Sequence, residues 1–315
     1  MGNYIMKRLG QTLAVLVIVS VGVFFLMDML PGDPVYAIYG EEISQDEYDK
    51  AFLELGLDKP AMVRYVDWLK DAMKGSFGTS SQSRVPVSEL LAVRVPITIY
   101  LAVLSFVISM PLGIVFGVIS AVYRGKPVDT AVTLLANICA CLPQFWVAIL
   151  LLYVFSMKLG LLPSYGFTWF YDDFGKSMRQ LAMPLFCLVL HGVAGTTRQT
   201  RSSMLEVIRQ DYIRTARSKG LKERKVIYLH ALKNGLIPVI SVMGTRLAHL
   251  VGGSMFVESV FSIPGMGSLF VKSIVSRDIP VVQACVLLTS LVSCAAYIVT
   301  DILYVLVDPR IQFEK

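Results

Sequence analysis

The sequence has few charged residues for a chain of its length. Asp, Glu, Lys and Arg make up only 17% of its 315 residues, whereas soluble domains average roughly a quarter. Hydrophobic residues account for 55% of the chain, and its mean hydropathy is +0.63. This composition argues against a soluble domain and predicts that lipid, rather than water, surrounds much of the protein.

Residues typical of metal, disulfide and nucleotide sites are scarce as well. The five cysteines lack the recurrent spacing of a disulfide framework or a metal site, and the three histidines lie far apart in the chain. We interpret the cysteines as small apolar side chains within helices. The phosphate-binding pattern GxxxxGK(S/T) is absent. The sequence therefore predicts no catalytic, metal or cofactor site in this chain. The cysteines are Cys139, Cys141, Cys187, Cys285 and Cys294.

Long runs of apolar residues are the main feature of the sequence. A helix needs about 20 mostly apolar residues to cross a bilayer, and six segments qualify, so we expect an all-α polytopic membrane protein with six transmembrane helices. The fourth segment is the weakest, because Pro184, His191 and Gly192 interrupt it. The segments are Leu9–Leu30, Ile97–Tyr123, Thr130–Leu159, Arg179–Thr196, Gly235–Phe256 and Pro280–Val307.

The first apolar run could be taken for a signal peptide, because Lys7 and Arg8 precede it. Its apolar core is about 20 residues long, beyond the usual 7–15 of a signal peptide, and no small-x-small cleavage site follows. We therefore expect a retained first helix.

The distribution of Lys and Arg predicts the topology, because short cytoplasmic loops are enriched in both. The segment Pro31–Pro96 holds seven basic and eleven acidic residues, whereas Arg198 to Lys233 holds ten basic and three acidic ones. All six spans then agree on a cytoplasmic N-terminus and C-terminus. The other basic residues on the inner side are Lys7, Arg8, Arg124, Lys126, Arg310 and Lys315.

The outer segment between the first two spans predicts a small helical cap. Ser44–Leu55 begins with a capping box of Ser44 and Glu47, and Pro60–Met73 has apolar residues at helical spacing. The expected organisation is thus an N-terminal transmembrane helix (1–30), an extracytoplasmic cap (31–96), and a core of five transmembrane helices (97–315) that contains a cytoplasmic loop (198–234).

Two ionisable residues lie in the middle of the fifth span. Arg246 and His249 are three residues apart, on one helix face that leads toward Glu258. Ionisable groups in spans usually face a protein interior or a water-filled path, so Arg246, His249 and Glu258 are candidate residues of the translocation path. The alternative for Arg246 and His249 is pairing with a partner subunit. Gly113-x-x-x-Gly117 and the pair Gly252-Gly253 favour close contact between helices.

The long basic loop reads as helix, break and helix. Tyr212, Ala216 and Lys219 share a face, Gly220 permits a sharp reversal, and a second apolar face of Val226, Leu229 and Leu232 follows. Small residues at the break would let another protein approach the backbone. A solvated positive-inside loop is the alternative, and nucleic-acid binding fits a loop fixed between two spans less well.

This loop resembles the coupling loop of permease subunits in bacterial ATP-binding-cassette importers, written Glu-Ala-Ala-x-x-x-Gly with a later Ile-x-Leu-Pro. It looks most like the peptide/nickel branch, the oligopeptide, dipeptide and nickel permeases. Within the loop, the matching segments are Arg201-Ser-Ser-Met-Leu-Glu206, Asp211–Gly220 and His230-Ala-Leu-Lys-Asn234. Elsewhere they are Leu30-Pro-Gly-Asp-Pro34, Leu55-Gly-Leu-Asp-Lys-Pro60, Gly75-Ser-Phe-Gly78, Gly252-Gly-Ser-Met-Phe-Val-Glu258, Pro264-Gly-Met-Gly267, Arg277-Asp-Ile-Pro-Val-Val-Gln283 and Asp308-Pro-Arg310.

The sequence also departs from the general motif. Arg214 and Thr215 stand where the first Glu and Ala would be, and the distance from Gly220 to Pro238 exceeds the general spacing. Ile263 precedes Pro264, where an aromatic residue is frequent.

The resemblance implies one of two permease subunits in the bacterial inner membrane. Two ATPase subunits would bind ATP and Mg²⁺ inside, and a solute-binding protein would deliver small peptides outside. The alternatives are a nickel or metal-chelate importer of the same branch and, in other classes, an ion-coupled carrier or a membrane enzyme. Residues expected to couple to an ATPase are Asp211, Tyr212, Arg214, Thr215, Ala216, Lys219 and Gly220.

Overall fold

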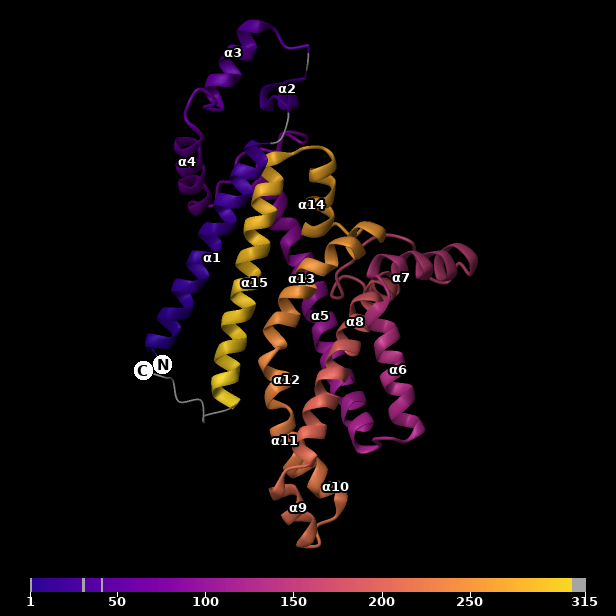
Figure 1. Cartoon of the computed structure of the whole chain (residues 1–315). Helices are drawn as coiled ribbons and strands as arrows, with labels where there is room; N and C mark the ends of the chain where they lie inside the picture. Colours follow the sequence, from indigo (N-terminus) through magenta and orange to yellow (C-terminus); the bar gives the residue numbers. More distant parts are fainter. Residues whose placement is uncertain (1, 30–31, 41, 308–315) are drawn as a thin grey trace. The chain divides into compact units, whose positions relative to one another are not determined.

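The computed structural model describes residues 2–29, 32–40 and 42–307, and its regular elements are helices (Figure 1). The chain forms two compact units. The first comprises residues 1–98 and 264–292, and the second comprises 99–263 and 293–315. Several expected features lie outside the described residues, namely Leu30 and Pro31 of the first outer motif, Asp308–Arg310, and Lys315.

The first unit contains the N-terminal helix and the predicted cap helices. Its elements are α1 (Gly2–Asp28), α2 (Pro34–Tyr39), α3 (Gln45–Glu54), α4 (Ala61–Met73), the start of α5 (Val87–Val122), α14 (Met266–Val275) and the start of α15 (Ile279–Val307).

Helix α4 packs on α1 through aromatic side chains. The ring centroid of Phe24 lies 5.5 Å from that of Tyr65 and 5.7 Å from that of Trp68. Ser20 and Tyr65 also share a hydrogen bond of 2.8 Å between their hydroxyls. Aromatic contacts of this kind add to the free energy gained from burial, so α4 is fixed to the N-terminal helix.

The capping box predicted for α3 is confirmed. The Glu47 amide donates to the Ser44 hydroxyl, and the Ser44 amide donates to the Glu47 carboxylate. One further contact joins α3 to α2: the Tyr48 hydroxyl donates to Asp33 at 2.5 Å. This hydrogen bond raises the pKa of Tyr48 to about 12, because the neutral phenol is the form that can donate.

The second unit contains the rest of α5, the elements that follow it up to α13, and the end of α15. These are α6 (Pro127–Cys141), α7 (Gln144–Leu151), the π-helix η1 (Leu152–Lys158), α8 (Phe174–Ile208), α9 (Asp211–Ser218), α10 (Glu223–Lys225), the π-helix η2 (Val226–Ala231), α11 (Leu232–Gly235), α12 (Ile237–Ser241), α13 (Met243–Val260) and the end of α15.

The apolar helices occur at the positions of the six predicted segments, but some of them are bent. Four helices are long and apolar enough to cross a membrane unbroken, and two bent pairs bring the count to as many as six within the described residues. The chain is therefore a multi-pass membrane protein by length and composition. The four unbroken candidates are Arg8–Asp28, Val87–Val122, Phe174–Ile208 and Ile279–Thr300.

The third and fifth predicted spans are not single straight helices. The third bends by 96° between α6 and η1, and the fifth bends by 46° before α13. Leu142 has an extended ψ of 125° because it precedes Pro143, and this ends α6. Val242, with ψ near 0°, marks the second bend. The fourth span, expected to be the weakest, is a continuous helix that includes Pro184.

Helices α5 and α8 run parallel and pack closely through small residues, as the Gly113-x-x-x-Gly117 pattern predicts. A Cβ on Gly117 would lie 2.8 Å from the Thr197 carbonyl oxygen, so only glycine fits without a shift. Contacts recur every four residues along both helices in the same direction. The pairs are Ser109–Gly192, Gly113–Thr196 and Gly117–Thr200.

Candidate functional site

The basic loop folds into a compact helical hairpin, which we define as residues 211–234 and call the coupling hairpin. In Figure 1 its helices α9 and α10 form the end of the second unit opposite α7. A cluster of buried apolar residues joins the hairpin to the ends of α5 and α8. Its members are Val118, Ala121, Met204, Ile213, Ala216, Val226, Ile227 and Ala231.

The residues predicted to share a face of the first hairpin helix differ in burial. Ile213, which the sequence analysis did not single out, is fully buried, and Ala216 is buried beside it. Tyr212 and Lys219 are exposed instead. The Tyr212 hydroxyl accepts a hydrogen bond of 2.8 Å from the Asn234 side chain, so it closes the base of the hairpin from outside.

The predicted second face, of Val226, Leu229 and Leu232, is partly wrong. Leu229 is exposed, whereas Val226, Ile227 and Ala231 are buried. The segment is a π-helix rather than an α-helix, so residues five apart, such as Val226 and Ala231, lie on one side. Helical periodicity of the ordinary kind could not reveal this shift.

The turn of the hairpin is held by glycine and by an ion pair. Gly220 has φ +74°, and a Cβ added there would meet nothing within 4 Å. Across the turn, the Arg217 guanidinium donates two hydrogen bonds to Glu223, of 3.1 and 2.7 Å. The carboxylate of Glu223 raises the pKa of Arg217. The turn is therefore ordered by its own chain and still open to a partner.

Two contacts connect Gly235, the residue that follows the coupling hairpin, to α8. The Ser203 hydroxyl donates to the Gly235 carbonyl oxygen at 2.6 Å. A Cβ on Gly235 would overlap the sulfur of Met204. Movement of the hairpin would thus be passed to α8 through buried, closely packed groups.

A buried ion pair lies close to this base, between α6 and α8. The Arg201 guanidinium donates to both carboxylate oxygens of Asp129, at 2.7 and 3.0 Å. Ser120 at the end of α5 and the amide of Gly125 also donate to Asp129. In the sequence, Arg201 stands out only as part of a matching motif, and Asp129 was not predicted as a site residue. Its position in the first turn of a helix beside a basic loop was the available signal.

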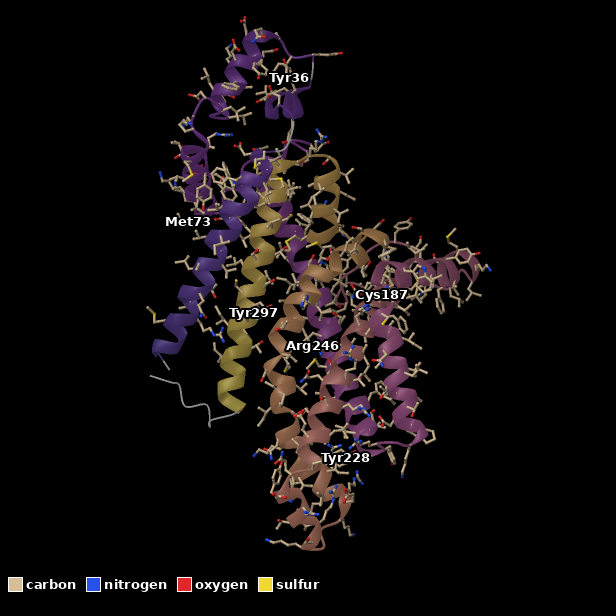
Figure 2. The ribbon with its side chains drawn as sticks, in the orientation of Figure 1. Tyr36, Met73, Cys187, Tyr228, Arg246 and Tyr297 are labelled. Carbon is tan, nitrogen blue, oxygen red and sulfur yellow. The ribbon has the colours of Figure 1, made fainter. Side chains whose placement is uncertain are left out.

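The candidate path residues lie in a different part of the same unit. Arg246 (labelled in Figure 2) and His249 both belong to α13 and line a cavity of about 460 Å³ between α5, α7, α8 and α13. We call it the α13 cavity. Its lining residues are Phe106, Ser109, Met110, Gln144, Phe145, His191, Gly192, Arg246, His249, Leu250, Gly253 and Phe256.

Glu258 does not line this cavity, although the sequence analysis grouped it with the other two. It is fully buried and accepts a hydrogen bond of 2.9 Å from Ser254, one turn earlier on α13. The structure thus brings Arg246 and His249 together and separates Glu258 from them.

The buried polar atoms of the α13 cavity are incompletely bonded. Within the described residues, Arg246 Nε and His191 Nδ1 are buried without a hydrogen-bond partner. No cluster of three or more His, Cys, Asp or Glu that could hold a metal ion occurs in the part of the chain that the structure describes. The cavity is therefore rich in nitrogen donors.

Comparison with known proteins assigns the family. The family described as binding-protein-dependent transport system inner membrane component matches residues 113–313, and the N-terminal family of such membrane components matches residues 1–102. The chain belongs to this permease family.

Relatives of this permease match over almost its whole length. A putative peptide transport system permease protein of Brucella abortus is 42% identical over 98% of this chain and 99% of its own. The oligopeptide transport system permease protein AppB of Bacillus subtilis is 37% identical over 99% and 100%. The glutathione transport system permease protein GsiC of Escherichia coli K12 is 38% identical over 99% of both chains.

Solved structures share the fold at low sequence identity. A chain of the inward-facing MetNI methionine transporter has a TM-score of 0.58 at 18% identity, covering 70% of this permease and 96% of that chain. An amino acid ABC transporter crystallised with histidines has a TM-score of 0.51 at 15% identity, covering 71% and 95%. The permease therefore has the fold of ABC transporter membrane subunits.

Proposed function

We propose that this permease forms half of the translocation path of an ATP-driven importer for small peptides. The observation that supports this most strongly is the full-length similarity to permeases named for peptide, oligopeptide and glutathione transport. The chain would work with a second homologous permease, two ATPase subunits that bind ATP and Mg²⁺, and an extracytoplasmic solute-binding protein.

The proposed topology has six spans, with both ends in the cytoplasm of a bacterial cell and residues 31–96 outside as a cap. The distribution of basic residues supports it, and so does the number of apolar helices when each bent pair counts as one span. In this topology the coupling hairpin faces the cytoplasm and the cap faces the binding protein.

The coupling hairpin would receive the motion of an ATPase subunit. Its turn is exposed at Gly220, while the buried faces of α9 and η2 are packed against α5 and α8. The surface left for a partner includes Asp211, Tyr212, Arg214, Thr215, Lys219 and Gly220. Ala216 would support this surface from within rather than touch the partner. Arg246 and His249 would face the path.

The variant Gly220→Asp tests the coupling role. A Cβ at Gly220 would meet nothing within 4 Å in the described chain, and the strain of a side chain at φ +74° is shared by the control below. Loss of function relative to that control is therefore attributed to a partner, against which an unpaired buried carboxylate is costly. We expect peptide uptake to be abolished while the amount of permease in the membrane is unchanged.

Gly160→Asp provides the matched control. Gly160 also has positive φ (+61°), and a Cβ there would also meet nothing within 4 Å, but it follows η1 and is not part of the coupling hairpin. Gly160→Asp should transport normally. Uptake by Gly220→Asp at the wild-type rate, with all subunits present, would rule out the coupling role.

A further inference from the structure

The α13 cavity has the dimensions and composition of a small-ligand site. Cavities that bind small molecules measure about 300–1,000 Å³ and combine apolar walls with a few polar groups, and this one is about 460 Å³. Phe106, Phe145 and Phe256 supply apolar walls. The polar groups come from four helices: Ser109 from α5, Gln144 from α7, His191 from α8, and Arg246 and His249 from α13.

The charge of this cavity is positive. No Asp or Glu is among its lining residues, and Arg198 on α8 adds a second cation that acts on Arg246 electrostatically. A cation in the membrane interior is costly unless it is paired or hydrated. The cavity therefore favours an anionic occupant and disfavours a free metal cation.

The position of the Arg246 guanidinium depends on glycine in the facing helix. A Cβ on Gly195 of α8 would overlap Arg246 Nη1 and lie 3.1 Å from Nη2. A side chain at Gly192 would likewise overlap Ser109. Helix α8 thus leaves room for the guanidinium beside the cavity, while Arg246 Nε stays without a partner in the described residues.

We propose that the α13 cavity binds a carboxylate of the cargo peptide during translocation, with the Arg246 guanidinium as the principal ligand and His249 and Gln144 as neighbouring donors. A guanidinium binds carboxylates through two parallel hydrogen bonds, and a peptide with a free C-terminus always brings one carboxylate. This inference rests on the proposed peptide import and adds the chemical group that the permease itself recognises.

The test compares a free-acid peptide with its C-terminal amide. The complete transporter, with its ATPases and binding protein, is reconstituted in proteoliposomes, and the initial import rates of a radiolabelled tripeptide and the tripeptide amide are measured. The quantity compared is the acid-to-amide rate ratio. Selection by the binding protein is the same for every permease variant, so it cancels when the ratios of variant and wild type are compared.

We expect Arg246→Gln to lower the acid-to-amide rate ratio about tenfold or more, because the free energy of a hydrogen bond to a charged group corresponds to a factor of about ten or more in rate. Arg246→Lys should restore part of the ratio. Gly195→Ala should lower it as well, because it displaces the guanidinium without changing charge. Gly252→Ala is the control, because a Cβ on that glycine of α13 would meet nothing within 4 Å, and it should keep the wild-type ratio.

Three outcomes would overturn this inference. An unchanged ratio in both Arg246→Gln and Gly195→Ala would show that the carboxylate is not recognised here. Failure of Arg246→Gln to assemble with the second permease, with an unchanged ratio in Gly195→Ala, would mean that Arg246 pairs with an acid of that subunit. If the wild-type transporter hydrolyses ATP but imports neither peptide, the proposed peptide import itself is wrong, and the carboxylate site falls with it.

Discussion

Arg201 and Asp129 form a two-point ion pair between α8 and α6, and the Asp129 side chain is only 8% exposed. The pair lies close to the base of the coupling hairpin, because Ser203 and Met204, which contact Gly235, lie within one turn of Arg201 on α8. It therefore fixes α6 to the helix that the hairpin would move.

Loss of either partner should destabilise the permease. Asp129→Asn leaves the Arg201 guanidinium without its counter-charge, and breaking a buried pair costs about 3–5 kcal/mol. Since the Arg201 side chain is 28% exposed, we expect the loss in free energy of unfolding to lie at the lower end of this range. The measurement is thermal unfolding of the detergent-solubilised transporter. Lys126→Gln, an exposed residue near α6, is the control, and equal stability of the two variants would contradict the prediction.

The close approach of α5 and α8 predicts a strict requirement for glycine. In Gly117→Ala the new methyl group would lie 2.8 Å from the Thr197 carbonyl oxygen, so the helices must separate. Overpacking of this kind costs about 1–3 kcal/mol. The matched variant Gly252→Ala adds the same methyl group in open space. Thermal unfolding should separate the two variants, and a Gly117→Ala protein as stable as Gly252→Ala would disprove the close packing.

The spans could be predicted from the sequence, because the length of an apolar segment is enough to identify it. The bends within the spans could not be predicted. Pro143 ends α6, but Pro184 leaves α8 intact, and nothing in either local sequence distinguishes the two outcomes. The helix–turn–helix form of the coupling hairpin was also predictable, because Gly220 marks a turn.

Some of the site residues could likewise be predicted from the sequence, and others could not. Arg246 and His249 were found because ionisable groups are rare in apolar spans. Glu258 was grouped with them by proximity in sequence, yet its carboxylate bonds within α13. Ile213 and Asp129 were missed because their importance comes from contacts with α5 and α8, which are distant in the chain.

The hydrogen bond between Tyr48 and Asp33 predicts that the Tyr48 phenol in the cap loses its proton at unusually high pH. Its raised pKa, about 12, lies above the ordinary value of 10.0 for tyrosine. The hydrogen bond therefore contributes fully below about pH 10 and is lost as pH rises through about 12, when the phenolate forms beside the carboxylate. The difference in phenolate absorbance between wild type and Tyr48→Phe should have its midpoint near pH 12. A midpoint at the ordinary value would exclude this hydrogen bond.

The burial of Ala216 separates two variants that the sequence alone would treat alike. Both Gly220→Asp and Ala216→Glu add a carboxylate to the coupling hairpin, but Gly220 is open while Ala216 packs with Ile213 in the buried cluster. A carboxylate in that cluster lacks a hydrogen-bond partner, which costs several kcal/mol. Ala216→Glu should therefore loosen the hairpin itself, even before any partner binds, and Gly220→Asp should not.

Limited proteolysis of permease-containing vesicles stripped of ATPase subunits distinguishes the two effects, because trypsin cleaves after the many Lys and Arg residues of the hairpin. We expect cleavage between residues 211 and 234 to become at least several-fold faster in Ala216→Glu and to stay unchanged in Gly220→Asp. Thr215→Glu places the same side chain at the exposed neighbouring position and should also leave cleavage unchanged. Equal protection of Ala216→Glu and Thr215→Glu would show that Ala216 does not support the hairpin from within.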